Sequence, residues 1–200
     1  MSSSAVVPRV GVLALQGDVR EHEGVLRSLG ADVVRVRRAE ELERVEALVI
    51  PGGESTVIDK LSRLFGLQAP IRARIAAGMP VLGTCAGLIM LADEITDAAA
   101  QQETFGGLDV VVQRNAFGRQ TESFEVELDV PELGAGAVHA AFIRGPVIVS
   151  VGPAVHPLAA LPDGRIVAVE QGPLIGLSFH PEITGEDRFH RRLLEHVRSQ

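Results

Sequence analysis

The first half of the chain alternates short apolar runs with segments whose apolar residues recur at helical spacing. An apolar run at residues 10–15 leads into Gln16-Gly17-Asp18, where Asp18 is expected to cap a helix that ends at Gly30. Further buried strands are expected at residues 31–36, 46–50 and 80–82. Unbroken apolar strands separated by helices indicate a parallel sheet that is covered on both faces.

Two of these strands run directly into expected helices. A short helix is expected at residues 88–92, after the strand at 80–82. A longer helix follows Pro51-Gly52-Gly53, and its expected buried face carries Val57, Ile58, Leu61 and Leu64.

From about Leu108 the pattern changes to successive strands separated by turn signals such as Pro162-Asp163-Gly164. A closing helix is expected at residues 186–197, with Phe189, Leu193, Leu194 and Val197 on its buried face. The expected strands lie at 109–113, 124–128, 137–143, 147–151, 155–161, 165–170 and 174–179. These patterns predict an α/β fold: a three-layer sandwich with a mostly parallel central sheet and mixed or antiparallel β additions in the C-terminal half.

Length and composition set the expected organisation. The chain has 200 residues, of which 46% are apolar and 22% charged, so we expect one globular domain over residues 1–200. Residues 1–8 are expected to form a disordered N-terminal extension. A single cysteine rules out a disulfide framework, and no apolar run approaches the length of a membrane span. We therefore expect a cytoplasmic protein.

The charge balance excludes several classes of function. A formal net charge of −7 argues against a general binder of nucleic acid backbones. The chain has no Trp and no Tyr, so stacking platforms for single strands are scarce. Lys60 is the only lysine, which excludes Schiff-base chemistry unless that residue is the nucleophile.

Cys85 lies in Gly83-Thr84-Cys85-Ala86-Gly87, at an expected turn from strand to helix. A nucleophile flanked by glycines in this way sits on a sharp turn at the carboxyl end of a sheet, with its side chain pointing outward. The positive end of the following helix favours a thiolate there. The alternative is that Cys85 is a small buried apolar residue, as free cysteines often are.

His180 and Glu182 lie in Ser178-Phe179-His180-Pro181-Glu182, also at the end of an apolar strand. A catalytic cysteine needs an imidazole to take its proton, and the imidazole needs a carboxylate to orient it. These three residue types therefore suffice for a Cys–His–Glu triad. The alternative is a surface His-Pro turn beside a solvated glutamate.

Pro51-Gly52-Gly53-Glu54-Ser55-Thr56 is a third segment at a strand end. Its two glycines leave backbone N–H groups bare, which suits an oxyanion hole, although a plain turn with a Ser or Thr cap has the same sequence. Arg114 and Arg144 are candidates for binding a carboxylate, or else solvated cations.

The other histidines show no metal-ligand spacing, so no metal site is expected. His22 is expected on a polar helix face, and His190 lies on the last helix.

Taken together, these motifs resemble the class I, triad-type glutamine amidotransferases. Three more segments resemble the glutaminase subunits of pyridoxal 5′-phosphate synthase: Leu15-Gln16-Gly17-Asp18, Arg114-Asn115-Ala116-Phe117-Gly118-Arg119-Gln120 and Phe142-Ile143-Arg144-Gly145-Pro146. The resemblance implies that Cys85 attacks the glutamine side-chain amide, His180 acts as base and then acid, and Glu182 orients His180. It further implies that glutamine is bound by Gly52, Gly53, Glu54, Arg114, Ile143 and Arg144.

The resemblance also implies a partner. Ammonia would pass to a separate (β/α)₈ synthase subunit that makes pyridoxal phosphate from a pentose phosphate and a triose phosphate. Pyridoxal phosphate would be the product of the complex, so no cofactor is expected on this chain. Three alternatives stay open: a glutaminase that serves another synthase, a cysteine hydrolase or peptidase that acts alone, and a non-catalytic binding subunit.

Overall fold

The computed structural model describes residues 7–114 and 123–200. Of the expected N-terminal extension, residues 1–6 lie outside this range, while the carbonyl of Pro8 already accepts a hydrogen bond from the Asp32 amide. In chain order the elements are β1 (Arg9–Leu13), α1 (Val19–Ser28), β2 (Asp32–Val36), α2 (Ala39–Leu42), β3 (Ala47–Ile50), α3 (Ser55–Leu64), α4 (Gln68–Ala76), β4 (Val81–Thr84), α5 (Ala86–Leu91), β5 (Ala92–Ile95), β6 (Leu108–Gln113), β7 (Phe124–Leu128), η1 (Pro131–Leu133), β8 (Val138–Phe142), β9 (Val147–Val151), β10 (His156–Ala160), β11 (Ile166–Gln171), β12 (Leu174–Leu177), α6 (Pro181–Thr184) and α7 (Arg188–Arg198).

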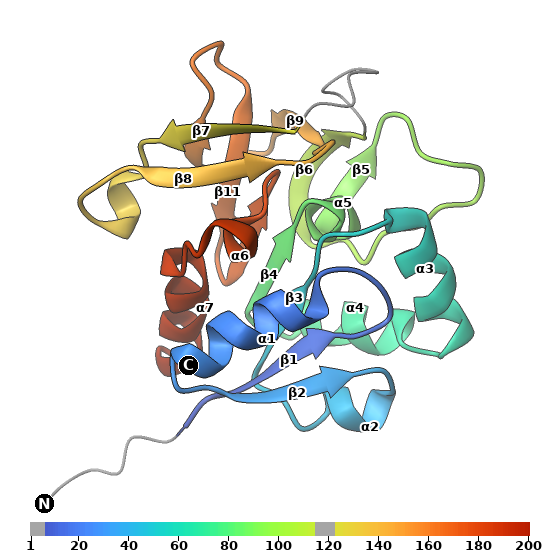
Figure 1. Ribbon diagram of the computed structural model, residues 1–200. Coiled ribbons are helices and arrows are strands. Elements are labelled where there is room, and N and C mark those ends of the chain that lie inside the picture. The colour runs from blue at the N-terminus through green and yellow to red at the C-terminus, as the bar shows by residue number, and fades with distance from the viewer. Residues whose placement is uncertain (1–6, 115–122) are drawn as a thin grey trace, which may run out of the picture.

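A ten-stranded sheet runs through the described residues in the order β2-β1-β3-β4-β12-β11-β9-β6-β5, with β10 paired to β11. The strands from β2 to β12 are parallel, which is the pairing that their unbroken apolar runs predict. Beyond β12 the pairing becomes antiparallel through β11, β9 and β6, and β5 then lies parallel to β6. Figure 1 shows the resulting twisted sheet across the molecule.

Helices cover both faces of the sheet, and the alternation along β3 shows how. Ala47 and Val49 pack into one buried cluster, and Leu48 and Ile50 pack into the other. The first cluster includes residues of α1 and α7, and the second includes residues of α3, α4 and α5. The predicted three-layer α/β sandwich is therefore confirmed.

A two-stranded sheet of β7 and β8 covers part of the α7 side. Its rings extend the core, because Phe124 stacks on Phe142 at 4.7 Å and Phe142 contacts Phe179 at 5.5 Å. Phe179 in turn meets Phe189 of α7 edge-on at 5.6 Å. This row of rings joins the hairpin, the end of β12 and the last helix.

The orientation of α3 differs from the prediction. Val57 and Leu64 are exposed, at 36% and 74%, and the buried side carries Ile58 with the polar residues Ser55, Asp59 and Ser62. Asp59 is buried because Arg63 neutralises it at 2.7 Å and the Glu103 amide donates to it. The prediction counted only apolar residues, so it placed the buried face of α3 on the wrong side of the helix.

The role of Asp18 also differs from the prediction. Asp18 does stand at the N-cap position of α1, but its side chain makes no capping hydrogen bond. Its carboxylate is turned instead toward His180, whose Nδ1 lies 3.4 Å from Asp18 Oδ2.

Five elements were not predicted from the sequence. These are α2, α4, β5, η1 and α6. Pro70 lies within α4, whose apolar residues do not gather on one face of the helix, and β5 follows α5 without an intervening turn. None of the helices described is long and apolar enough to span a membrane.

The parallel half of the sheet fixes the position of the candidate residues. Because β1, β3, β4 and β12 run in the same direction, their carboxyl ends meet along one edge. The segments that follow these strands are Gln16-Gly17-Asp18, Gly52-Gly53, Cys85 and His180. All four predicted motifs are thereby brought to one edge.

Replacing a core ring should cost far more stability than replacing an exposed apolar side chain. Phe189 is fully buried, so Phe189→Ala should lower the free energy of unfolding by about 3–5 kcal/mol. Leu64→Ala is the matched control, and it should change that free energy by less than about 0.5 kcal/mol. Urea unfolding followed by circular dichroism measures both, and equal losses would contradict this packing.

Candidate active site

Cys85 occupies a strained turn between β4 and α5. Its φ of 49° lies in the left-handed region that non-glycine residues seldom adopt. Its amide donates to the Leu177 carbonyl at 2.8 Å, which ties the turn to the neighbouring strand β12. The sharp turn expected from the sequence is therefore present, with the side chain only 7% exposed.

The two flanking glycines permit this turn because backbone atoms approach them too closely for a side chain. A Cβ at Gly87 would overlap the Ile50 carbonyl of β3, and a Cβ at Gly83 would lie 2.6 Å from the Gly87 carbonyl. The N-terminus of α5 therefore rests directly on the sheet, with Cys85 at its first turn.

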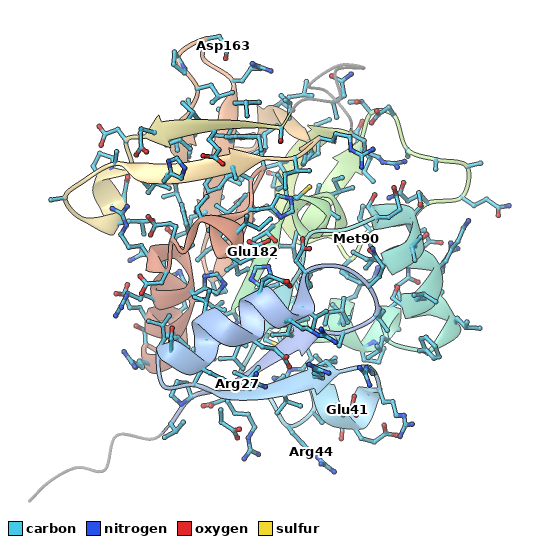
Figure 2. All side chains as sticks on the ribbon, in the orientation of Figure 1. Arg27, Glu41, Arg44, Met90, Asp163 and Glu182 are labelled. Carbon is cyan, nitrogen blue, oxygen red and sulfur yellow. The ribbon has the colours of Figure 1, made fainter. Side chains whose placement is uncertain are left out.

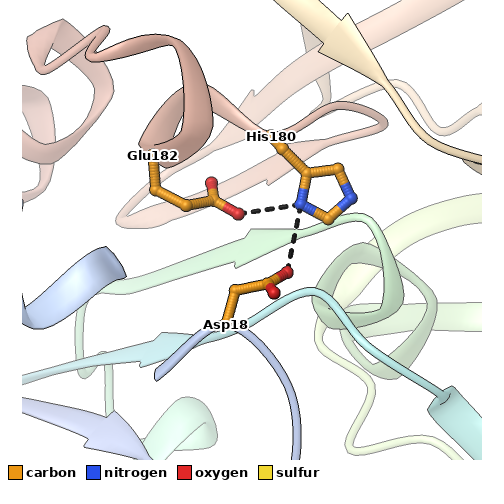
Figure 3. A group of neighbouring side chains, drawn as sticks. All are labelled: Asp18, His180 and Glu182. Atoms are coloured by element: carbon orange, nitrogen blue, oxygen red, sulfur yellow. Dashed lines mark hydrogen bonds and ion pairs between the residues drawn. The ribbon is translucent and has the colours of Figure 1, made fainter. Parts of the chain in front are cut away.

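His180 stands between β12 and α6 and is held from three directions. Its amide donates to the Ala141 carbonyl of β8 at 3.0 Å. Its Nδ1 lies 2.8 Å from Glu182 Oε1 and 3.4 Å from Asp18 Oδ2, as Figure 3 shows. Since both partners are carboxylates, Nδ1 carries a proton, and Nε2 is left to exchange a proton with Cys85.

The electrostatics of the site favour a charged imidazole. Burial alone opposes protonation of His180, but hydrogen bonds with Asp18, Cys85 and Glu182 raise its pKa to about 12. Burial raises the pKa of Glu182, and the hydrogen bond from His180 opposes that rise. The imidazole is therefore well suited to accept and hold a proton from its neighbour.

A cavity of about 380 Å³ opens onto the Cys85 and His180 side chains. Four of the predicted substrate residues line it, and Arg144 does so from a backbone with φ of 49°. The lining is formed by Gln16, Asp18, Gly53, Glu54, Cys85, Ile143, Arg144, His180 and Ile183.

The other two predicted substrate residues lie behind this lining. Gly52 is packed against the His180 ring, where a Cβ would overlap the imidazole. Arg114 reaches the site through Glu54, since its guanidinium lies 3.3 Å from Glu54 Oε1 and 2.9 Å from Gln102 Oε1. The rest of its motif, residues 115–120, lies outside the described residues.

Gln16 and Gly17 clamp the glycine loop that follows β3. The side-chain oxygen of Gln16 accepts a hydrogen bond from the Glu54 amide at 2.7 Å. Gly17 has a φ of 99°, and a Cβ there would overlap the Gly52 carbonyl. The turn into α3 is capped by Glu54, which accepts from the Thr56 amide, and no Ser or Thr side chain is its cap.

Asp18, His180 and Glu182 also present ligand-type atoms within 4.8 Å of one another. The hydrogen bond from His180 Nδ1 to Glu182 already accounts for this grouping. An ion at this position would compete with that proton for the same nitrogen.

A buried pair of histidines lies behind Glu182, which corrects the polar face expected for His22. His22 and His190 are both fully buried, and His22 Nδ1 lies 2.8 Å from His190 Nε2. His22 Nε2 lies 3.2 Å from Thr84 Oγ1 and 3.6 Å from Glu182 Oε2. Figure 2 shows Glu182 near the middle of the molecule, whereas Arg44 and Asp163 project from its rim.

Sequence reasoning missed Asp18, Gln16 and His22 as members of this site. The position of Gln16 and Asp18 could have indicated their role, because both follow the carboxyl end of β1, where the other site residues also lie. His22 lies one helical turn beyond Asp18 on α1, so it comes from the same end of that helix.

Comparison with known proteins gives a consistent family. The SNO glutamine amidotransferase family matches residues 12–199. A protein of Clavibacter sepedonicus named pyridoxal 5′-phosphate synthase subunit PdxT is 65% identical over 190 residues, which cover 95% of this chain and 91% of that protein. A protein of the same name from Leifsonia xyli is 64% identical over 190 residues, covering 95% and 96% of the two chains.

A solved structure also resembles the chain throughout. It is described as the crystal structure of a glutamine amidotransferase, and it is 49% identical in sequence. The match has a TM-score of 0.87 and covers 94% of this chain and 98% of that one.

The buried histidine pair should make the protein less stable in mild acid. Burial lowers the pKa of His190 from 6.5 to about 4. Between these pH values the unfolded chain binds a proton that the folded chain does not, so the free energy of unfolding falls as pH decreases, by about 3 kcal/mol from this residue. His190→Gln keeps a donor for His22 without a titratable group, so its stability should fall less over the same range.

Urea unfolding at several pH values between neutrality and pH 4 measures this difference. Parallel curves for the two proteins would contradict the lowered pKa of His190 in the folded state.

Proposed function

The chain belongs to the SNO glutamine amidotransferase family, and from this premise we propose that it hydrolyses L-glutamine to L-glutamate and ammonia with Cys85, His180 and Glu182. The observation that carries the proposal is the convergence of a strained cysteine turn and a carboxylate-bound imidazole on one cavity. We further propose that residues 1–200 act as one amidotransferase domain.

The first half of the reaction forms a thioester. The thiol proton of Cys85 passes to His180 Nε2, and Sγ attacks the carboxamide carbon of glutamine. The carbonyl oxygen becomes an oxyanion beside the Gly52-Gly53 peptide and the amide of Ala86, the first residue of α5. His180 then gives its proton to the nitrogen, the carbon–nitrogen bond breaks, and ammonia leaves.

The second half of the reaction releases glutamate. Neutral His180 takes a proton from a water molecule, and the hydroxide attacks the thioester carbon. The carbon–sulfur bond breaks, the thiolate regains the proton from His180, and glutamate departs. Glu182 holds the Nδ1 proton of His180 through both halves, so the ring keeps one orientation.

The charged ends of glutamine match the charged groups around the cavity. Glu54 presents a half-exposed carboxylate that suits the α-ammonium group, and Arg144 presents a guanidinium that suits the α-carboxylate. Arg114 holds Glu54 in place from behind. Gly53 and Ile143 shape the wall nearest the reacting amide, and Gly52 supports this wall from behind.

The ammonia is delivered to a separate synthase subunit, with which this chain forms a complex. Support comes from the names of its relatives, which are called subunits of pyridoxal 5′-phosphate synthase. We take the partner to be a (β/α)₈ subunit that joins ammonia to a pentose phosphate and a triose phosphate, making pyridoxal phosphate as a product and not as a cofactor here. We place the protein in the cytoplasm, where reducing conditions keep a lone thiol free.

Glutamate release with and without the synthase subunit tests this proposal. Glutamine hydrolysis should rise when the synthase is added and should fall to background in Cys85→Ala, because no other thiol in the chain can form the thioester. Strong activity without the partner would favour a hydrolase that acts alone. Absence of Cys85-dependent release from the bound, folded complex would favour a binding subunit.

Gly52→Ala should disable the site without unfolding the protein. The new methyl group would overlap the His180 ring and lie 3.0 Å from Asp18 Oδ2, so the imidazole must move. Glutamate release by the complex should fall by at least about 100-fold. Gly24→Ala is the matched control, because a Cβ at that position on α1 meets no atom within 4 Å, and it should retain full activity. Equal activities of the two variants would contradict the packing described for Gly52.

A further inference from the structure

One carboxylate oxygen of Glu182, Oε2, has no hydrogen-bond donor among the described residues. Glu182 Oε1 accepts from His180 Nδ1, but Oε2 is buried without a hydrogen-bond partner, and the side chain is fully shielded from solvent. A buried carboxylate oxygen with no donor favours the neutral acid. A neutral Glu182 would hold the His180 imidazolium less firmly, so this oxygen needs a donor for the site to work.

His22 is placed to supply that donor. Its Nε2 lies 3.6 Å from Glu182 Oε2, just beyond hydrogen-bond distance, and 3.2 Å from Thr84 Oγ1. It comes from α1, while Glu182 comes from α6 and Thr84 directly precedes Cys85 on β4. Three separate elements therefore converge at this buried point.

The hydrogen-bond pattern selects one tautomer of His22. If Nδ1 of His22 carried the proton, it would donate to His190 Nε2, and His190 Nδ1 would become a buried N–H without an acceptor. The bare Nε2 of His22 would also face the carboxylate oxygen. In the opposite tautomer, His190 Nε2 donates to His22 Nδ1, and His22 Nε2–H points at Thr84 and Glu182. Only the second arrangement leaves no donor unpaired.

We propose that His22 is a positioning residue, whose neutral imidazole directs Nε2–H toward Glu182 Oε2 and thereby keeps Glu182 ionised and aimed at His180. The inference rests on the glutamine hydrolysis proposed above and adds a fourth side chain to it. His190 fixes the tautomer of His22 from α7.

The surrounding charges are consistent with a neutral His22. The groups that face it are His180 and Glu182 at α6, His190 of α7 and Thr84 of β4. Burial lowers the pKa of His22 well below 6.5, and the neighbouring His190 and His180 lower it further. His22 therefore stays a neutral donor while His180 carries the positive charge.

A purely structural role for His22 predicts different kinetics. If it only joins α1 to α7 and β4, its loss reduces stability and leaves the turnover of folded enzyme unchanged. A positioning role lowers kcat for glutamate release and leaves KM nearly constant, because His22 does not itself line the cavity. Loss of the donor also raises the pKa of Glu182, so the acid limb of the kcat profile moves to higher pH.

The test compares His22→Leu with His22→Gln in the complex with the synthase subunit. Leu keeps the volume and removes both nitrogens, whereas the Gln amide can place a neutral N–H near the position of Nε2. We expect kcat of His22→Leu to fall by at least about tenfold, with KM within about twofold and the acid limb raised by about one pH unit. His22→Gln should recover at least about a third of the wild-type kcat.

A matched control separates lost stability from lost positioning. Ser62 is fully buried on α3, where its hydroxyl donates to the Asp59 carbonyl, and it belongs to neither the site nor the histidine pair. Ser62→Ala should lower stability without changing kcat. A wild-type kcat and pH profile in folded His22→Leu would overturn the inference, while an inactive wild-type complex would instead overturn the proposed function.

A spectroscopic measurement decides the matter even if His22→Leu does not fold. Nitrogen-15 spectra of the wild-type histidine rings should show His22 neutral and protonated at Nε2 from neutral pH into mild acid. A ring protonated at Nδ1, or charged over this range, would overturn the inference.

Discussion

The close approach of α5 to the strands beneath it is the constraint on which the site depends. Gly83 and Gly87 allow backbone to meet backbone, and only then can Cys85 take a left-handed turn at the end of β4. Such a backbone costs about 1–3 kcal/mol. It is offset by the complete burial of Leu88, Met90 and Leu91, which anchor α5 in the core. The reactive residue is thus held by packing that lies beneath it and not by the loops around it.

A second feature is the way charge is arranged from the cavity inward. His180 meets two carboxylates at one ring nitrogen, one of them partly exposed on the cavity wall and the other sealed in the interior. Behind the sealed carboxylate lie the neutral polar side chains of Thr84, His22 and His190. The site therefore has one strong cation between two anions, and its polar connections reach α7 through His22 and His190.

The sequence predicted the positions of the strands well and the buried faces of the helices less well. Unbroken apolar runs located nearly every strand, and the glycine-flanked Cys85 located the turn, because both signals are local. The faces of α1 and α3 were misjudged, since Asp59 and His22 are polar residues whose burial depends on partners distant in sequence. Asp59 is neutralised by Arg63 and bonded to Glu103, and His22 meets His190, which lies 168 positions away. The spacing of apolar residues along the sequence carries no information about such pairings.

The solitary thiol has a practical consequence. Cys85 is the only cysteine in a chain that has no tryptophan and no tyrosine, so the protein absorbs little near-ultraviolet light but carries a single reactive sulfur in its cavity. Reaction with a small thiol reagent therefore counts competent sites directly, without a background from other cysteines. A bulky reagent is excluded by the 7% exposure of that residue until the chain opens. The ratio of the two labelling rates therefore measures how often the folded protein opens locally.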